Sequence, residues 1–124
     1  MLVVDDQEDA RDLMVAILTR VGARVETAAS ADAALNRLRE ARPDVLLADI
    51  GMPGKDGYAL IADVRRMDAQ FEARLPAVAI TAYVSERDRE KALAAGYDCH
   101  VPKPVTHTAI VAAVLAIAPG AGHP

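Results

Sequence analysis

Short apolar runs alternate with helix-like stretches along this 124-residue chain, and this alternation constrains its fold more than any other feature. The runs LVV, VLLA and AVAI are apolar at every position, as expected for strands that are buried on both faces of a sheet. The stretches between them place apolar side chains three and four residues apart, which is the helical period. Strands that alternate with helices favour a parallel sheet covered by helices on both faces, so we expect one α/β domain.

The pattern predicts five strand–helix pairs. Strands are expected at residues 2–4, 24–28, 45–48, 77–80 and 97–101, and the alternating 24–28 segment is the predicted edge strand. Helices are expected at residues 10–21, 31–41, 58–67, 86–95 and 107–118, with hydroxyl N-caps at Ser30, Ser85 and Thr106 and glycine ends at Gly22 and Gly96. We expect residues 1–118 to form the domain and residues 119–124 to form a flexible tail.

Composition narrows the class of protein. A hydrophobic content of 52% suits a small domain with its own core, and a formal net charge of −4 argues against a nucleic-acid-binding surface. The longest apolar stretch, residues 109–118, is roughly half the length needed to cross a bilayer. The chain opens without a signal peptide, and its single cysteine, Cys99, cannot form an internal disulfide. These features predict a soluble, cytoplasmic protein without nucleic-acid or membrane contact.

Charged residues follow three of the predicted strands. Asp5 and Asp6 follow LVV, Asp49 follows VLLA, and Lys103 follows the last strand. Parallel strands present their carboxyl ends at one edge of the sheet, so we expect these side chains to meet. Three crowded carboxylates need a bound cation or a proton, and oxygen ligands favour Mg²⁺, with Mn²⁺ as a substitute. A nearby lysine suits a phosphoryl group. Alternatively, Asp5 or Asp6 caps the first helix.

The ordered motifs VVDDQ, ADIGMPGKDG, ITA and AAGYDCHVPKP cover essentially the whole chain. Together they resemble the receiver domain of two-component response regulators. The resemblance implies a flavodoxin-like (βα)5 fold, a three-layer sandwich whose parallel five-stranded sheet has the order 2-1-3-4-5. The phrases DIGMPGKDGY and AGYDCHVPKPV look most like receivers at the C-terminus of hybrid sensor histidine kinases.

The resemblance also implies roles for the acidic residues. Asp49 is the expected phosphoacceptor, which takes a phosphoryl group from a phosphohistidine of a histidine kinase or a histidine phosphotransfer domain and forms an aspartyl phosphate. Mg²⁺ is expected to bind Asp6, Asp49 and the backbone carbonyl of Gly51, with Asp5 contributing directly or through a metal-bound water. On this view the chain is a signalling domain that catalyses only its own phosphorylation and slow dephosphorylation.

Further residues have expected roles by the same resemblance. Lys103 pairs with the acceptor carboxylate and then with a phosphoryl oxygen, and Pro104 follows a cis peptide bond. Thr81 donates its hydroxyl to the new phosphoryl group and forms a switch with His100, which stands where tyrosine or phenylalanine is more common and adds a titratable ring.

Two positions are expected to tune the lifetime of the phosphoryl group. Gly51 has no side chain to orient an attacking water, and Tyr83 would shield the phosphoryl group, so we expect slow self-dephosphorylation. A haloacid dehalogenase-type enzyme is the less favoured reading, because such enzymes normally carry a second aspartate where Gly51 stands. A stand-alone receiver and a non-phosphorylated interaction module with the same fold remain the alternatives.

The last predicted helix has no polar residue between positions 109 and 118. A surface helix normally has one apolar stripe, so we expect part of the surface formed by the fourth helix, the fifth strand and the fifth helix to contact a partner, another domain of the same polypeptide or a second copy. The first strand begins close to the start of the sequence, and we expect excision from a longer protein.

Overall fold

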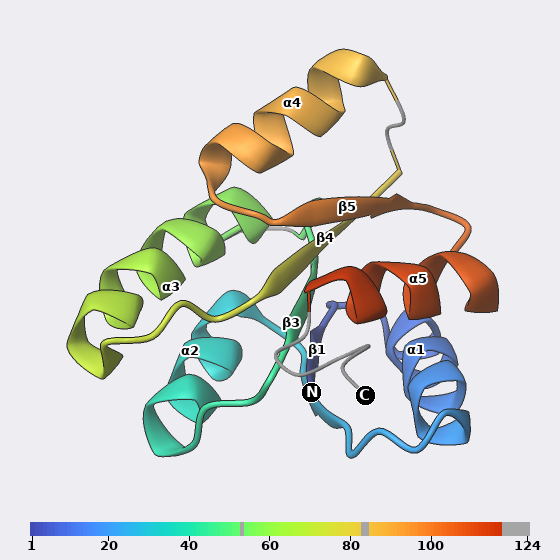
Figure 1. Cartoon of the computed structure of the whole chain (residues 1–124), viewed down its shortest axis with the longest axis horizontal. Helices are drawn as coiled ribbons and strands as arrows, with labels where there is room; N and C mark the ends of the chain where they lie inside the picture. The colour runs from blue at the N-terminus through green and yellow to red at the C-terminus, as the bar shows by residue number, and fades with distance from the viewer. Residues whose placement is uncertain (53, 83–84, 118–124) are drawn as a thin grey trace.

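Five parallel strands form the central sheet of the computed structural model, which describes residues 1–52, 54–82 and 85–117 (Figure 1). The strands are β1 (Leu2–Val4), β2 (Glu26–Ala28), β3 (Leu46–Asp49), β4 (Ala77–Thr81) and β5 (Cys99–Pro102). Their order is β2-β1-β3-β4-β5, and each neighbouring pair is parallel. The predicted flavodoxin-like fold and its strand order are therefore confirmed, with β2 at an edge.

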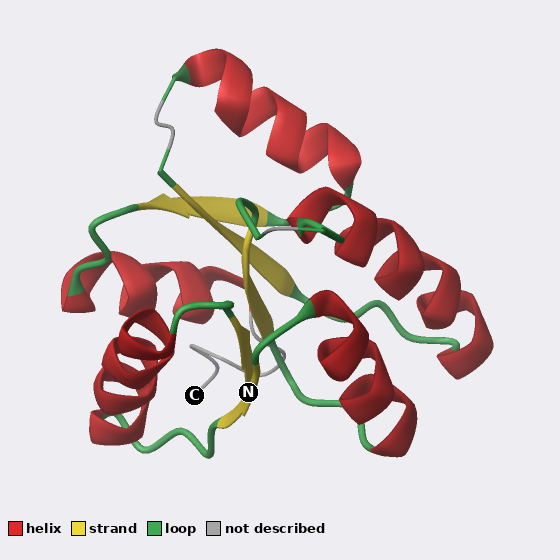
Figure 2. Cartoon of the chain, turned by 180° about the vertical axis from the view of Figure 1, so that it is seen from behind, coloured by secondary structure: helices red, strands yellow, loops and turns green. Residues whose placement is uncertain are grey.

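Helices cover both faces of this sheet (Figure 2). They are α1 (Glu8–Arg20), α2 (Ala31–Glu40), α3 (Gly57–Phe71), α4 (Glu86–Ala95) and α5 (His107–Ile117). One core cluster joins the sheet to α1 and α5, and the other joins it to α2, α3 and α4. The result is a three-layer sandwich with the sheet in the middle.

Alternation along the strands explains why the apolar runs are continuous. In β3, Leu46 and Ala48 pack in the cluster with α2 and α3, whereas Leu47 packs in the cluster with α1 and α5. In β4, Ala79 and Val78 divide between the two clusters in the same way. Because successive side chains point to opposite faces and both faces are covered, successive positions within β3 and β4 select apolar residues.

The predicted caps and helix ends are confirmed. Backbone N–H groups donate to the hydroxyl oxygens of Ser30, Ser85 and Thr106, each at 3.1 Å. Gly22 and Gly96 follow α1 and α4 with φ of 89° and 127°, a region that suits glycine. These local signals position ends of four helices, α1, α2, α4 and α5, relative to the sheet.

Several predicted boundaries were wrong. Helix α3 continues to Phe71 rather than ending near residue 67, because Asp68 is held within a polar network and not released into a loop. Helix α1 begins at Glu8, with Gln7 as its N-cap residue and no side-chain cap, so neither Asp5 nor Asp6 caps it. Strands β2 and β5 begin two residues later than expected. The tail at 119–124 lies outside the described residues.

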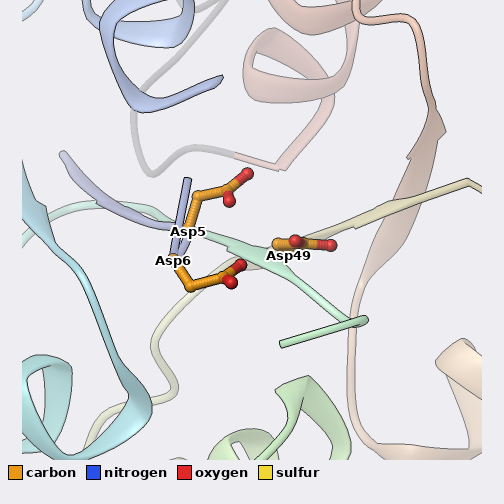
Figure 3. A group of neighbouring side chains, drawn as sticks. All are labelled: Asp5, Asp6 and Asp49. Carbon is orange, nitrogen blue, oxygen red and sulfur yellow. The ribbon is translucent and has the colours of Figure 1, made fainter. Parts of the chain in front are cut away.

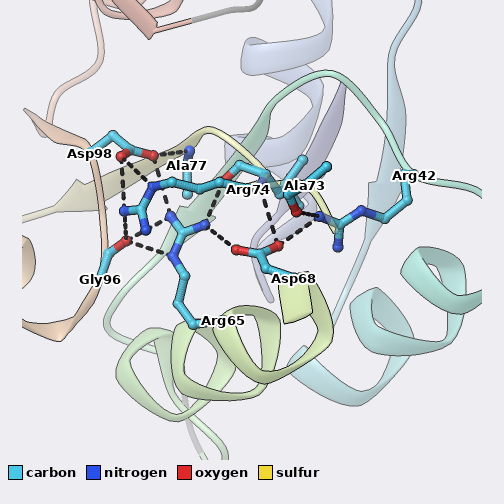
Figure 4. A network of polar contacts seen from close by, with 9 residues as sticks. Arg42, Arg65, Asp68, Ala73, Arg74, Ala77, Gly96 and Asp98 are labelled. Atoms are coloured by element: carbon cyan, nitrogen blue, oxygen red, sulfur yellow. Dashed lines mark hydrogen bonds and ion pairs between the residues drawn. The ribbon is translucent and has the colours of Figure 1, made fainter. Parts of the chain in front are cut away.

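Arginines hold α3 to the segments that precede β4 and β5 (Figure 4). Arg65 donates to the carbonyls of Leu75 and Gly96 and to the carboxylates of Asp68 and Asp98. A second arginine shares each carboxylate: Arg42 binds Asp68, and Arg74 binds Asp98.

Among the helices that the structure describes, none has the length and apolar character required to cross a membrane.

Candidate functional site

Three carboxylates meet where β1 and β3 end (Figure 3). One oxygen from each of Asp5, Asp6 and Asp49 lies within 4.8 Å of the others. Asp5 and Asp49 are buried, with 4% and 6% of their surface exposed, whereas Asp6 is exposed to solvent. Strands β1 and β3 are neighbours in the sheet, so the predicted meeting of these side chains is confirmed.

Lys103 lies beside this acidic cluster. Its Nζ is 3.2 Å from Oδ2 of Asp49 and 3.7 Å from Oδ2 of Asp5. The backbone N–H of Lys103 donates to the carbonyl of Thr81 at 2.8 Å, which ties the end of β5 to the end of β4. The Lys103–Pro104 peptide bond is cis, as the resemblance implies. A single cation therefore lies beside two buried carboxylates, which come from the ends of two different strands.

Backbone N–H groups orient two of the carboxylates. The N–H of Gly51 donates to Oδ1 of Asp49 at 3.1 Å, and the N–H of Gln7 donates to Oδ1 of Asp5 at 2.9 Å. Arg11 also donates to the backbone carbonyl of Asp5 at 2.7 Å. Each buried carboxylate thus has one oxygen fixed by the main chain, while Lys103 lies near the other.

The burial of Asp5 and the charges around it favour a bound cation. Burial raises the pKa of Asp5 above its ordinary value, and the charges of Asp49 and Asp6 raise it further, although the N–H of Gln7 and the charge of Lys103 act in the opposite direction. A carboxyl group whose ionised form is disfavoured by burial and by like charges gains from a bound cation. Three carboxylates with only oxygen donors suit a hard divalent ion such as Mg²⁺.

A cavity of about 250 Å³ opens beside the carboxylates and is lined by predicted site residues, namely Asp6, Asp49, Gly51, Thr81 and Lys103. Thr81 is buried at the end of β4, with 5% of its surface exposed. The cavity can hold a small anion between the lysine and a carboxylate-bound cation. Gly51 lines it as expected, and its predicted metal-binding carbonyl stays a prediction.

The structure describes His100, the predicted switch residue on β5, but not Tyr83, one of the two predicted lifetime positions. His100 lies on β5 opposite Ala79 of β4 and is half-buried, and its buried Nε2 has no hydrogen-bond partner among the described residues. Tyr83 lies outside the described residues.

Cys99 is half-buried, and burial together with Asp98 raises the pKa of its thiol, which disfavours the reactive thiolate.

The structure also identifies contacts of the acceptor loop that sequence reasoning missed. The hydroxyl of buried Tyr97 donates to the carbonyl of Gly57 at 2.7 Å. Asp56 caps α3 by accepting from the N–H of Ala59 at 2.9 Å. The aspartate–glycine pair before a helical pattern could have indicated the cap, whereas a contact across 40 residues leaves no local signal.

An apolar hollow of about 170 Å³ lies next to the site, between α1 and the loop that follows β5. Ala10, Leu13 and Met14 line it from α1, and Pro104 and Val105 line it from the loop. Leu13 leaves 48% of its surface exposed there. Lys103 and Asp5 belong to the same lining, so the hollow adjoins the charged cluster.

Known proteins resemble this chain in sequence and in fold. The model of the response regulator receiver domain matches residues 1–115. The chain is 43% identical to the "Uncharacterized 14.6 kDa protein in sodA1 3'region" of Leptolyngbya boryana, over 85% of this chain and 79% of that protein. It is 33% identical to hybrid signal transduction histidine kinase D of Dictyostelium discoideum, over 94% of this chain but only 8% of the kinase. The chemotaxis protein CheY4 of Vibrio cholerae is similar in structure, with a TM-score of 0.84, 28% identity and coverage of 94% of this chain and 95% of that one.

Proposed function

The chain belongs to the response regulator receiver domain family, and from this we propose that it is the phosphoacceptor domain of a two-component phosphorelay, with Asp49 as the acceptor. The observation that carries the proposal is the buried Asp49 carboxylate, which lies 3.2 Å from the Lys103 ammonium and next to two further carboxylates. A structural ion pair needs only one carboxylate for each lysine, so the excess of acids indicates a site for a cation and a phosphoryl group.

In the proposed reaction, a carboxylate oxygen of Asp49 forms a bond to the phosphorus of a phosphohistidine. The phosphorus–nitrogen bond breaks, and its electron pair stays on the imidazole nitrogen of the donor. Lys103 is near enough to stabilise the charge that grows on the transferred oxygens, and the Thr81 hydroxyl is proposed to donate to the same group. Mg²⁺ held by Asp5, Asp6, Asp49 and the Gly51 carbonyl would supply further neutralisation of negative charge.

The proposed donor is a histidine kinase or a histidine phosphotransfer domain. A donor histidine must bring its ring to the open side of the site, and the hollow lined by Leu13 and Pro104 offers apolar surface directly beside it. The hybrid kinase relative supports attachment to other domains of a longer polypeptide as one setting for the chain.

Phosphorylation is proposed to change the surface formed by α4, β5 and α5. Thr81 and His100 lie on the adjacent strands β4 and β5, so a movement of the threonine toward the phosphoryl group can be followed by the imidazole. The added group carries roughly two negative charges, enough to bias a two-state element. The exposed Leu115 on α5 suits a partner, another domain or a second copy on this surface.

The phosphoryl group is proposed to be long-lived. Gly51 has no side chain to orient an attacking water, and Tyr83 stands two residues after Thr81 in the sequence. A half-life measured by loss of the added mass tests this directly, and a half-life of only seconds would contradict it.

Intact mass spectrometry after incubation with acetyl phosphate tests the proposed function. We expect one added phosphoryl group in the presence of Mg²⁺, and none after chelation or in Asp49→Asn. Asp44→Asn is the matched control, because Asp44 is an exposed aspartate just before the same strand. A wild-type chain that gains no mass with Mg²⁺ would favour the non-phosphorylated interaction module.

A further inference from the structure

The segment Gly96–Asp98, between α4 and β5, is bound to α3 at two places. At the start of α3, the Tyr97 hydroxyl donates to the carbonyl of Gly57 at 2.7 Å. In the second half of the helix, Arg65 donates to the carbonyl of Gly96 from Nε at 2.9 Å and from Nη2 at 2.6 Å (Figure 4). Arg65 and Arg74 also bind the carboxylate of Asp98. The backbone on both sides of Tyr97 is therefore fixed.

Gly57 closes the loop that begins at the acceptor. Its N–H donates to the carbonyl of Ile50, the residue after Asp49, at 3.1 Å. A Cβ on Gly57 would lie 2.6 Å from Cα of Ile50, 2.8 Å from the carbonyl oxygen of Asp49 and 3.1 Å from the Tyr97 hydroxyl. Gly57 is thus packed directly between the backbone of the acceptor and the tyrosine.

The surroundings of Tyr97 favour a persistent hydrogen bond from its hydroxyl to the Gly57 carbonyl. Only 2% of the residue is exposed, so water does not compete for the hydroxyl. Burial, followed by the charge of Asp56, raises the pKa of Tyr97 well above that of free tyrosine, so the hydroxyl stays a donor across the neutral range. Without the hydroxyl, the Gly57 carbonyl would keep only the acceptor role that its place at the start of α3 gives it, and the side-chain bond that holds it to the segment between α4 and β5 would be lost.

We propose that Tyr97 is a positioning residue for phosphoryl transfer: its hydroxyl holds Gly57 against Ile50 and thereby keeps the acceptor loop in the arrangement that binds the cation. This inference rests on the proposed function for its link to transfer, but its first consequence, the affinity for Mg²⁺, is measured on the unphosphorylated chain. When the loop occupies the binding arrangement only part of the time, the apparent affinity falls by that fraction.

Tyr97→Phe removes only the hydroxyl and keeps the ring. We expect Mg²⁺, titrated alone by calorimetry, to bind about 5-fold more weakly, and phosphorylation by acetyl phosphate at limiting Mg²⁺ to slow by a similar factor. We also expect faster amide exchange in residues 50–52 and 54–57. Tyr58→Phe is the matched control, since the Tyr58 ring face contacts the Lys91 ammonium at 4.6 Å and this contact does not need the hydroxyl.

A purely structural role gives a different pattern. Ile110→Val shortens a buried side chain of α5 in the other core cluster and lowers stability without touching the loop. If Tyr97→Phe only lowers the melting temperature, as Ile110→Val does, and keeps wild-type Mg²⁺ affinity, amide exchange and transfer rate, the inference is overturned. A wild-type chain that neither binds Mg²⁺ nor accepts phosphate would instead overturn the proposed function and the inference with it.

Discussion

Arg65→Met should destabilise the chain strongly although it lies far from the acidic site. The side chain of Arg65 is 17% exposed and donates to two carbonyls and two carboxylates. Methionine keeps most of the apolar stem, which packs near Gly96, so the change isolates the guanidinium. Removing it leaves four acceptors with fewer donors.

The size of the effect follows from what each acceptor retains. Breaking a buried ion pair outright costs about 3–5 kcal/mol, because one charge is left alone. Here Asp68 keeps Arg42 at 2.6 Å, Asp98 keeps Arg74 at 3.0 Å, and the carbonyl of Gly96 keeps a hydrogen bond from Arg74 at 3.1 Å. The carbonyl of Leu75 loses its Arg65 bond at about 1 kcal/mol, and two weakened charge-assisted bonds add a similar amount each. We expect a loss of about 2–3 kcal/mol, or roughly 8–12 °C in melting temperature for a domain of this size.

The pH dependence of this loss has a definite sign. Burial alone would raise the pKa of Asp68, but hydrogen bonds from Arg42, Arg65 and the N–H of Leu75 outweigh it and hold the pKa below its ordinary value. A lowered pKa contributes stability above the ordinary carboxyl value, and that stability is lost as the pH falls through the lowered value. The difference between wild type and Arg65→Met should therefore shrink on acidification.

Urea denaturation of the two proteins at about pH 7 and about pH 3 measures both effects. Arg66→Met is the matched control, because Arg66 is the next residue of α3, is 74% exposed and pairs with Asp63 at the surface. An exposed pair contributes at most about 1 kcal/mol. A loss of stability in Arg65→Met no larger than that in Arg66→Met at neutral pH would refute the role assigned to the Arg65 guanidinium.

Three further outcomes are expected at the site. Lys103→Met should keep the fold but slow phosphorylation by acetyl phosphate by about 100-fold or more, measured by intact mass, and near-wild-type kinetics would contradict its role. Asp5→Asn should weaken Mg²⁺ binding and raise the melting temperature in chelator at neutral pH. Burial, then neighbouring carboxylates, raise the pKa of folded Asp5, so the stability that its protonated carboxyl contributes at low pH is lost as the pH rises through the raised pKa. Asparagine stays neutral and avoids this loss. An unchanged melting temperature would count against the crowding. Gly57→Ala should cost about 1–3 kcal/mol in urea denaturation, because the new Cβ meets the Ile50 backbone at 2.6 Å, and a neutral effect would show that the loop yields freely.

The α/β class and the meeting of the acids were predictable because their signals are local, whereas the strand order was implied only by the family resemblance. Continuous apolar strands indicate burial on both faces, and parallel topology then brings the ends of β1 and β3 to one edge, where Asp5, Asp6 and Asp49 lie together. The hydroxyl caps were predictable for the same reason, since each depends on one residue and the next turn of its helix.

The missed features depend on contacts between distant residues. Asp68 looks like the start of a polar loop, but Arg42 and Arg65 hold it within α3, and the helix continues to Phe71. The hydrogen bond from Tyr97 to Gly57 spans 40 residues, and no periodicity records it. Asp5 carries a signal for helix capping as well as one for metal binding, and only the position of Gln7 at the start of α1 separates them.

The central claim is that one of three crowded carboxylates accepts the phosphoryl group. The most direct test is to incubate the chain with acetyl phosphate and Mg²⁺, reduce the acyl phosphate with borohydride, which converts a phosphorylated aspartate to homoserine, and locate that residue by tandem mass spectrometry. The site described here, with Lys103 at 3.2 Å from Asp49, predicts homoserine at position 49 alone. Homoserine at position 5 or 6, or at none of the three, would contradict the assignment of Asp49 as the acceptor.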